Sequence, residues 1–519
     1  MKKKRQSEEH IHKTSTKRPP VKKTKEQIKR EKEEAKFREE EQKRIEKEEK
    51  KKKAKHNREY AVVAYSFFTL FICIVGYISY FIFYESEKVI DNPYNKRIDN
   101  YATTVVRGNI TDANGNILAY TNVAEDGTES RIYPYADVFA QVVGYTTTGK
   151  SGIESAENRK LLTSSSDIKE KLEKTRSSEK QKGDTVVTTL DAKLQQLAYN
   201  ALGDNKGAVV IIEPSTGKVK AMVSKPSFDP NTLSANWDNI SNSSDSVLLN
   251  RATQGLYPPG SIFKTLTTLE YLRENSGNYL NYSYDCGGSI THNNYTLACY
   301  DNTAHGHVDL KQSFAKSCNS SYANIGLGLN IDSFANLCES MLFNKNIDFD
   351  LDVKKSSFVL NSSSNTTDIM MTSIGQGETE VTPFHMALLA ATVANNGVLM
   401  KPHLVERIEN YKSEVVSSQG NEVYETLMST EEAQIIQEFM EEVVNSGTGF
   451  RFNGSSFTVA GKTGTAEYSS DKNVSHSWFI GYTPTDGAQL AIAVVVEGGG
   501  ANAASAIPVC KEIFNGYYG

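Results

Sequence analysis

The chain contains one long uncharged segment, from Tyr60 to Tyr84, that is rich in Phe, Ile, Val and Tyr. At about 1.5 Å per residue, a helix of this length crosses a hydrocarbon core of about 30 Å. The sequence therefore predicts a transmembrane helix over residues 60–84. A cleaved signal peptide is the competing interpretation, but the bulky exit Ile82-Phe83-Tyr84-Glu85 does not suit a small-residue cleavage site.

Basic residues lie directly before this segment, at Lys50 to Lys53, Lys55 and Arg58. Positive charge of this kind stays on the cytoplasmic side of a membrane. We therefore expect a single-pass cell membrane protein with a cytoplasmic N-terminus. Everything after Tyr84 is expected to lie outside the cytoplasm.

The first 59 residues hold 24 basic and 13 acidic residues and almost no apolar ones, whereas the remainder holds 34 basic and 50 acidic residues. Such a tail forms no core, and we expect a solvated helix or a disordered segment near anionic lipid. Charge runs of this kind are usually solvated, so no nucleic-acid partner is expected.

Five of the six cysteines follow the apolar segment, at positions 286, 299, 318, 338 and 510, and the sixth, Cys73, lies inside it. Cys286 and Cys299 flank a Gly-rich, hairpin-like loop, so a disulfide is compatible with an oxidising exterior. His305 and His307 follow closely, which makes zinc ligation conceivable, but the spacing fits no common zinc site well. The sequence leaves the disulfide and free thiols equally open and ranks a metal behind both.

The region after the membrane begins with a hairpin signal. Residues 107–118 alternate apolar and polar side chains around the Asn114-Gly115 turn. A small β-rich module is expected up to about Arg159, and the charged, Ser-rich stretch 164–180 reads as a linker or an exposed helix.

Strand patterns lie at both ends of the remaining sequence and helical patterns lie between them. A strand at 184–190 and a helix through Leu194, Leu197 and Leu202 come first, then a hairpin of 208–212 and 219–223 around Pro214-Ser215-Thr216-Gly217. Residues 260–400 are mainly helical, and strands return at 457–460, 478–482 and 490–497. This order predicts an α+β domain with one sheet assembled from distant parts of the chain.

These signals divide the 519 residues into four parts. They are a basic cytoplasmic tail (1–59), a transmembrane helix (60–84), a small pedestal or dimerisation-like module with its linker (85–183), and a large α+β domain (184–519).

Ser261-Ile-Phe-Lys264 follows Pro258-Pro259-Gly260 and opens an apolar helical pattern. Positions i and i+3 share one helix face, so the lysine amine can reach the serine hydroxyl. An amine acts as a base only when it is uncharged, which requires desolvation or neighbouring positive charge. The pattern is weak by itself, because Ser-x-x-Lys also occurs at 166/169, 177/180, 215/218, 313/316 and 469/472.

Two further short motifs follow in order. Ser317-Cys318-Asn319 lies in the helical middle, and Lys462-Thr463-Gly464-Thr465 continues the strand-like residues 457–460. Each string is common by itself, and chance copies of the same form occur at Ser234-Ala235-Asn236 and Ser363-Ser364-Asn365. The order and setting of all three motifs together are informative.

The set resembles the penicillin-binding protein and serine β-lactamase superfamily. The resemblance extends from about Asp184 to the C-terminus and includes the strings 375–377, 381–383, 459–467 and 477–482. It implies an antiparallel sheet with helices on both faces. The segment 107–118 is similar to the start of the non-catalytic module of class B penicillin-binding proteins, and the short region from Ala102 to about Gly183 has no room for a glycosyltransferase domain. The nearest subgroup is the compact penicillin-binding protein A type.

The resemblance assigns roles to named residues. Ser261 would be the nucleophile, Lys264 its base, Ser317 a proton relay, Asn319 a residue that positions Lys264 and the substrate amide, and Lys462 a positive charge that helps keep Lys264 neutral. In the segment Thr463-Gly464-Thr465, the two threonines would bind the terminal carboxylate of the substrate. The backbone N–H groups of Ser261 and Thr465 would form the oxyanion hole.

The implied reaction is peptidoglycan crosslinking by a D,D-transpeptidase, through a serine acyl-enzyme that releases D-alanine and that penicillin also forms. The implied partners are a D-Ala-D-Ala stem peptide as donor, an amine as acceptor and, by analogy, a membrane-embedded glycan polymerase; no cofactor or metal is implied. A D,D-carboxypeptidase, a β-lactamase, a penicillin sensor and a structural subunit of the division or elongation machinery are the alternatives. The membrane anchor and the extra module argue against a soluble β-lactamase, and residues 1–59 cannot fold into the effector domain of a sensor.

Overall fold

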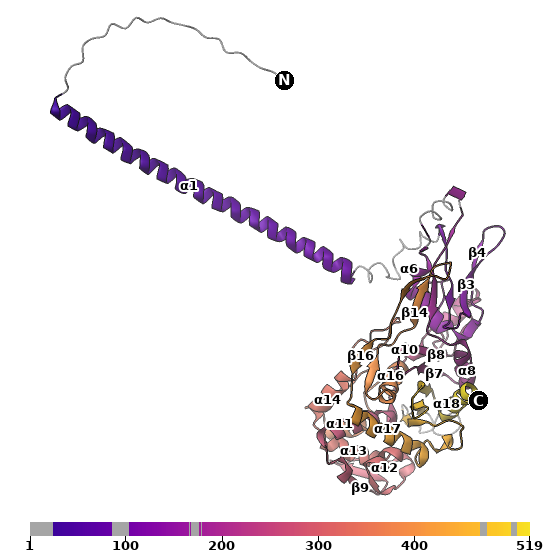
Figure 1. The fold of residues 1–519 in the computed structure, drawn as a ribbon. Coiled ribbons are helices and arrows are strands. Elements are labelled where there is room, and N and C mark those ends of the chain that lie inside the picture. Colours follow the sequence, from indigo (N-terminus) through magenta and orange to yellow (C-terminus); the bar gives the residue numbers. More distant parts are fainter. Residues whose placement is uncertain are drawn as a thin grey trace. The chain divides into compact units, whose positions relative to one another are not determined.

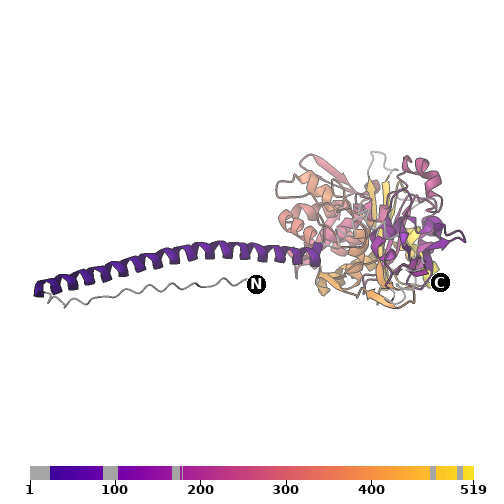
Figure 2. The same ribbon diagram turned by 90° about the horizontal axis from the view of Figure 1, so that it is seen from above.

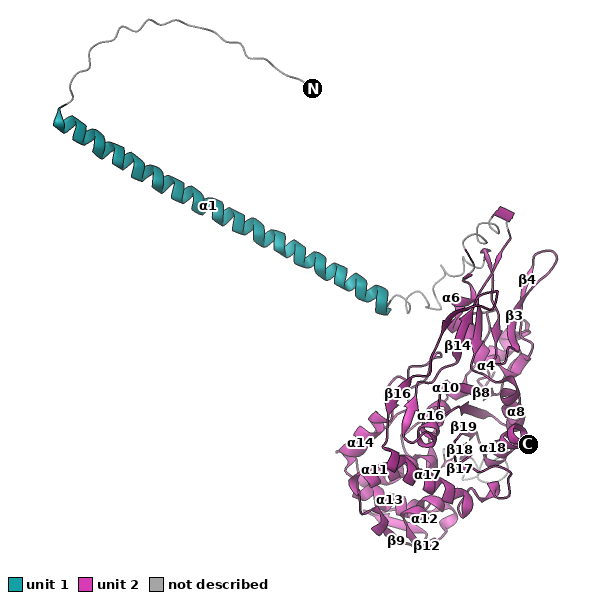
Figure 3. Cartoon of the chain, viewed as in Figure 1, with its two compact units in different colours: residues 1–89 teal, residues 90–519 magenta. Residues whose placement is uncertain are grey.

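The computed structural model describes residues 24–85, 103–165, 167, 176–177, 179–467, 475–499 and 506–519. Backbone contacts divide the chain into two units, residues 1–89 and 90–519, which are coloured separately in Figure 3. The expected linker 164–180 and the first 23 residues of the tail lie largely or wholly outside the described residues.

The first unit contains one continuous helix. α1 (Lys25–Tyr80) runs into a π-helical turn (Phe81–Glu85), and it is unbroken in both views of Figures 1 and 2. A capping box between Thr24 and Gln27 starts it. The described part of the tail is therefore helical. Among the described residues this is the one helix long and apolar enough to cross a membrane, with a mean hydropathy of 2.2 in its apolar window.

The core of the second unit is a five-stranded antiparallel sheet that joins distant parts of the chain, as the sequence predicts. The order is β17 (Ala460–Glu467), β18 (Ser475–Thr483), β19 (Leu490–Val496), β7 (Gly207–Ile212) and β8 (Val219–Lys225). One boundary differs from the prediction, because residues 457–459 lie before β17. The Thr458 carbonyl accepts a hydrogen bond from the Thr483 hydroxyl, so it takes part in a loop and not in the ladder.

Helices cover both faces of this sheet, which confirms the expected layers. Alternate residues of β7 face opposite ways: Val209 and Ile211 pack with α8 (Ala192–Leu202) and α18 (Ala506–Tyr518), whereas Val210 packs with α16 (Pro383–Ala394). Because both faces are buried, the strands are continuously apolar and not alternating. The sheet is therefore a rigid support for β17, the edge strand that carries the third motif.

The middle of the chain folds beside this sheet as helices with a small β-rich insert, as Figure 1 shows around the labels α11 to α14. The insert contains two two-stranded ladders, β9–β12 and β10–β11. The helices are α9 (Leu233–Ser241), α10 (Arg251–Gln254), α11 (Lys264–Glu274), α12 (Leu310–Ala315), α13 (Asn319–Gly328), α14 (Ile331–Ser340), α15 (Thr366–Ser373) and α17 (Thr430–Asn445), and the inserted strands are β9 (Ser283–Cys286), β10 (Ser289–His292), β11 (Tyr295–Ala298) and β12 (Gly306–Asp309).

A six-stranded sheet forms the rest of the unit, in the order β15-β14-β6-β2-β3-β4. The expected hairpin at Asn114-Gly115 is present as the antiparallel pair β2 and β3. β6 lies parallel to β2, so the sheet combines strands from both sides of residue 183. The bounds are β2 (Ile110–Thr111), β3 (Ile117–Val123), β4 (Glu129–Ile132), β6 (Thr185–Thr188), β14 (Val405–Glu409) and β15 (Val415–Ser418).

A buried ion-pair cluster fixes the base of this second sheet. Glu154 lies in α5 (Gly152–Ala156), is fully buried, and accepts hydrogen bonds from Arg107 Nε at 2.6 Å and Arg131 Nε at 2.7 Å. Burial opposes its charge, but the two guanidinium groups prevail and hold the pKa of Glu154 below its ordinary value. Smaller elements complete the unit: α4 (Ala140–Val143), α6 (Asn158–Leu161), β1 (Val105–Val106) paired with β5 (Gln181–Lys182), and β13 (Val398–Met400) paired with β16 (Val423–Thr426).

Candidate active site

Ser261 lies in a single 3-10 turn, Gly260–Phe263, that leads directly into α11. Gly260 has φ +56°, and a Cβ there would approach the Thr465 carbonyl oxygen to 2.5 Å. Only glycine accepts both the left-handed backbone and the close approach. The Gly260 amide also donates to the Gly375 carbonyl at 2.8 Å. The Pro-Pro-Gly entry therefore holds Ser261 against the open edge of β17.

Lys264 is the first residue of α11 and is fully buried. Its Nζ donates to the Ser317 carbonyl at 2.7 Å, to Ser317 Oγ at 3.2 Å and to Asn319 Oδ1 at 2.7 Å. Among the hydrogen bonds of the described residues none joins Lys264 to Ser261, so the amine is oriented by the second motif and not by the serine three residues before it.

Ser317 lies between α12 and α13, and not within a helix, with φ +54°. This left-handed backbone is uncommon for serine and marks a conformation that the surroundings impose. Cys318 caps α13 by accepting the Ser321 amide at its sulfur. Asn319 begins α13, and its amide nitrogen donates to the Ala298 carbonyl at 3.1 Å.

β17 supplies the third motif in strand alternation. Lys462 is fully buried, and its Nζ donates to Ser317 Oγ at 3.0 Å and to the Thr463 carbonyl at 3.0 Å. Thr463 and Thr465 share the accessible face and line the pocket. Gly464 points the other way, where a Cβ would lie 3.1 Å from the Pro259 carbonyl. The small residue thus lets β17 approach the turn that bears Ser261.

The two lysines are desolvated together. Burial lowers the pKa of Lys264 to about 7, against an opposing electrostatic influence of Cys318 and Cys299. Burial, and then repulsion from Lys264, lowers the pKa of Lys462 well below its ordinary value. Because both amines donate to the Ser317 hydroxyl, the charged form of either amine disfavours the charged form of the other.

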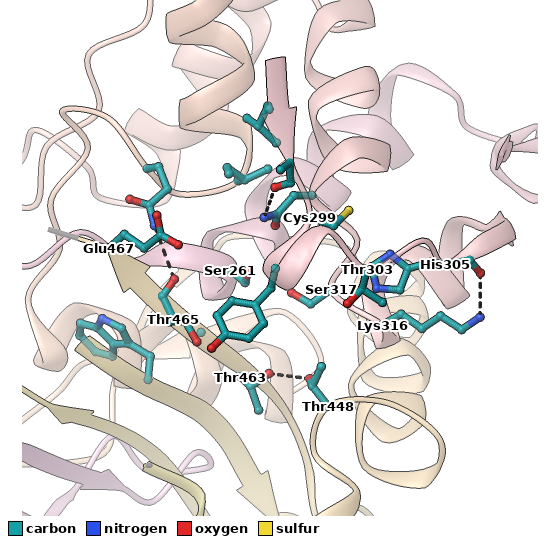
Figure 4. A pocket seen from close by; sticks show the side chains of 18 of the residues that line it. Ser261, Cys299, Thr303, His305, Lys316, Ser317, Thr448, Thr463, Thr465 and Glu467 are labelled. Atoms are coloured by element: carbon teal, nitrogen blue, oxygen red, sulfur yellow. Dashed lines mark hydrogen bonds between the residues drawn. The ribbon is translucent and has the colours of Figure 1, made fainter. Parts of the chain in front are cut away.

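The three motifs border one open pocket of about 880 Å³. Figure 4 shows Ser261, Ser317, Thr463 and Thr465 around it. Sequence reasoning missed Thr448, whose hydroxyl lies 2.5 Å from the Thr463 hydroxyl. Its signal was the Gly447-Thr448-Gly449 string in the loop before β17, which resembles any surface turn. Gln376, Tyr300 and His305 also line the pocket.

The cysteines of the inserted strands are not disulfide-bonded. Cys286 Sγ and Cys299 Sγ lie 3.7 Å apart, and all six cysteines are free thiols. Cys286, Cys299, Cys318 and His305 instead converge at one wall of the pocket. His307 is exposed and paired with Asp285 at 2.8 Å.

The family was identified by comparison with known proteins. The family model described as the penicillin binding protein transpeptidase domain matches residues 207–515, and the model described as the penicillin binding protein A dimerisation domain matches residues 107–186. The chain belongs to the penicillin-binding protein transpeptidase family. This confirms the resemblance drawn from the three ordered motifs, including the penicillin-binding protein A subgroup, and makes the protein a serine acyl-transfer enzyme.

Relatives of this penicillin-binding protein are known in mycobacteria. The peptidoglycan D,D-transpeptidase PbpA of Mycolicibacterium smegmatis is 31% identical over 452 residues, which cover 80% of this chain and 89% of the relative. Penicillin-binding protein A of Mycobacterium tuberculosis, solved as an imipenem acyl-enzyme complex, is 28% identical with a TM-score of 0.73 and covers 80% of this chain and 100% of that one. Its penicillin G acyl-enzyme complex has a TM-score of 0.72, with 80% and 99% covered.

Proposed function

We propose that this chain is a membrane-anchored peptidoglycan D,D-transpeptidase with Ser261 as its nucleophile. The observation that carries the assignment is the convergence of two fully buried lysine amines, Lys264 and Lys462, on the Ser317 hydroxyl beside the turn that holds Ser261. A buried amine with a pKa near 7 is a base at neutral pH, which an exposed lysine is not.

In the acylation step, Ser261 Oγ attacks the carbonyl carbon of the D-Ala-D-Ala peptide bond and its proton passes to the neutral Lys264 amine. The C–N bond then breaks, and the Ser317 hydroxyl delivers a proton to the departing D-alanine nitrogen while it is reprotonated from the adjacent ammonium. An acyl ester on Ser261 remains. Penicillin enters the same step, but its opened ring stays attached to the acyl group.

In the second step, an amine from a neighbouring stem peptide attacks the ester carbonyl. Lys264, neutral again, takes a proton from the attacking amine as the new amide bond forms. It returns this proton to the Ser261 oxygen as the C–O bond breaks, which restores both the hydroxyl and the neutral lysine. The products are one D-alanine and one peptide crosslink. Water as acceptor would instead give a D,D-carboxypeptidase.

The edge strand β17 would bind the substrate. The Ser261 and Thr465 amides are proposed as the oxyanion donors, each worth about 3 kcal/mol in the transition state. Thr463 and Thr465, on the accessible face of β17, would hold the terminal carboxylate of the donor peptide. Asn319 would orient Lys264 through the 2.7 Å hydrogen bond and contact the substrate amide.

The charge pattern around the apolar segment supports a topology, and analogy with class B penicillin-binding proteins supports a partner. We place residues 1–59 in the cytoplasm, the span at 60–84 and the enzyme outside, because the basic run 50–58 precedes the apolar part of α1. We further propose the division into a pedestal (85–183) and a catalytic domain (184–519), and a membrane-embedded glycan polymerase as the source of uncrosslinked glycan.

The test uses the full-length protein in detergent, with Ser261→Ala and a matched control, Ser215→Ala, which removes the serine of a Ser-x-x-Lys string in the turn between β7 and β8. Fluorescent penicillin should label wild type and Ser215→Ala equally and leave Ser261→Ala unlabelled. With a stem-pentapeptide donor and an added D-amino acid, wild type should release D-alanine and form the aminolysis product.

Each remaining outcome decides against the proposal in a defined way. Hydrolysis without aminolysis would assign a carboxypeptidase, and turnover of the penicillin label would assign a β-lactamase. Normal labelling with no release of D-alanine would assign a sensor or a structural subunit. Labelling of Ser261→Ala would overturn the choice of nucleophile.

A further inference from the structure

Three thiols and one imidazole meet at the wall of the pocket that carries Ser317. Cys286 lies at the end of β9, Cys299 directly after β11, His305 directly before β12, and Cys318 at the N-terminus of α13. The four ligand atoms all lie within 4.8 Å of one another. Figure 4 shows Cys299 and His305 near Ser317.

Three of the six distances between ligand atoms match tetrahedral coordination closely, and the others lie within 4.8 Å. Sγ atoms of Cys286 and Cys299 lie 3.7 Å apart, those of Cys299 and Cys318 lie 3.8 Å apart, and Cys286 Sγ lies 3.4 Å from His305 Nδ1. Zinc–sulfur and zinc–nitrogen bonds of about 2.3 and 2.0 Å place tetrahedral sulfurs roughly 3.8 Å apart, and sulfur and nitrogen roughly 3.5 Å apart. A disulfide would need sulfurs about 2.05 Å apart, and it would leave the third thiol unused.

The surroundings also suit thiolate ligands. The three cysteines are buried. The Ser320 hydroxyl lies 3.1 to 3.4 Å from all three sulfurs, and the Ser321 amide donates to Cys318 Sγ. Hydrogen-bond donors around ligand atoms fix and stabilise a metal site. The cluster has no carboxylate, and soft sulfur with imidazole selects zinc over magnesium or calcium.

We propose that Cys286, Cys299, His305 and Cys318 form a structural zinc site. The three thiols bind as thiolates, so each loses its proton to solvent when the metal enters. Four protein ligands close the coordination sphere, as in structural zinc sites and unlike catalytic ones. The metal takes no part in acyl transfer.

The site would position the second catalytic motif. Cys318 separates Ser317 from Asn319, and Cys299 follows Ala298, whose carbonyl accepts the Asn319 amide. A metal that joins Cys318 to Cys299 therefore fixes the backbone next to Asn319 and the strand end that accepts its side-chain amide. Asn319 Oδ1 in turn accepts the hydrogen bond from Lys264 Nζ. The metal would also tie the left-handed Ser317 backbone to the inserted strands.

Metal content gives the first test, and it is independent of activity. Full-length wild type, purified under reducing conditions, is compared with Cys299→Ala and with Cys338→Ala, a buried cysteine of α14 outside the cluster. Elemental analysis should find one zinc per chain in wild type and Cys338→Ala. In competition with a chelator, the zinc affinity of Cys299→Ala should be at least about tenfold weaker than that of wild type.

Cobalt titration of the metal-stripped wild-type chain keeps the test decisive if Cys299→Ala fails to fold. Cobalt should give thiolate charge-transfer absorption that saturates at one equivalent and that zinc displaces. Absence of both bound zinc and the cobalt spectrum would overturn the site. The site would also be overturned if the freshly purified protein had a mass two hydrogens below that of the fully reduced chain, because this difference indicates one disulfide.

The positioning role has a separate test. Removing zinc should slow acylation by fluorescent penicillin at a temperature where the stripped protein is still folded, and added zinc should restore the rate. Unchanged labelling after metal removal would overturn the positioning role. Labelling that fails even with zinc bound would count against the proposed function and not against the metal site.

Discussion

The pH dependence of acylation reports the environment of Lys264. Burial sets its pKa at about 7, whereas an exposed lysine has a pKa of about 10.4. At pH 7.5 the buried group is about three-quarters neutral, and an exposed lysine would be about 0.1% neutral. Only the neutral amine can take the proton of Ser261, so burial raises the active fraction of the enzyme several-hundredfold at neutral pH.

The direction follows from the sign of the shift. Neutral Lys264 accumulates as the pH rises through 7, so the acylation rate should rise with pH and level off above about 8. Between pH 7.5 and 6.0 the neutral fraction falls about eightfold, and at lower pH it falls about tenfold per unit. Time courses with fluorescent penicillin from pH 5.5 to 9, at constant ionic strength, measure this profile. Melting temperatures measured at each pH distinguish protonation of Lys264 from unfolding of the protein.

A matched variant tests whether burial, and not the second amine, sets the pKa of Lys264. Lys462→Met keeps the volume of a buried chain but removes the second amine. Its labelling will be slower, yet the midpoint of its pH profile should stay near 7, because burial and not a charge on Lys462 lowers the pKa of Lys264. A wild-type profile that is flat from pH 6 to 8, or a midpoint near 10, would refute the argument.

Substitutions at three further positions test the support of the site and of the second sheet. Gly260→Ala puts a Cβ against the Thr465 carbonyl in a left-handed turn, so the variant should lose about 1–3 kcal/mol of stability in thermal melting and should not be labelled by penicillin. The control Gly277→Ala also has a positive φ but lies in open space, and it should keep labelling. Ser317→Ala and Ser317→Gly should both acylate slowly, but the glycine variant should be the more stable by about 1 kcal/mol in urea unfolding because it accepts φ +54°. Glu154→Gln leaves two buried guanidinium groups without their carboxylate and should lower the free energy of unfolding by about 3–5 kcal/mol in the same assay. Because the pKa of Glu154 is lowered, its contribution to stability is present above pH 4.5 and is lost as the pH falls further.

The sequence predicted the sheet and the catalytic motifs because both depend on local signals. Apolar strands such as 208–212 and 490–497 have few alternatives, and the order of three short motifs is informative where each one is not. The start of β17 was misplaced because the Thr458 carbonyl accepts a hydrogen bond from the side chain of Thr483, the last residue of β18. A strand propensity contains no information about such a competitor.

The cysteine cluster was predicted only in part: the sequence offered Cys286, Cys299 and His305 as conceivable zinc ligands, but it missed Cys318 and included His307. Its ligands come from four separate points between residues 286 and 318, and spacing rules recognise only sites in which ligands are paired at short intervals along the chain. Loop and strand geometry brings Cys299 and His305 to Cys318, a residue that the motif pattern treats as variable. Proximity in space here follows from the fold of the insert and not from any string of residues.

The partners of the two lysines explain why the three motifs must occur together. A buried ammonium group is normally paired with a carboxylate, because an isolated charge is costly to desolvate. Among the ion pairs of the described residues none involves Lys264 or Lys462, whose acceptors are carbonyls, an amide oxygen and the Ser317 hydroxyl. These neutral acceptors meet the hydrogen-bonding needs of an uncharged amine, but they offset little of the desolvation cost of a charged one. The absence of a carboxylate among them therefore selects the neutral base that acylation of Ser261 requires.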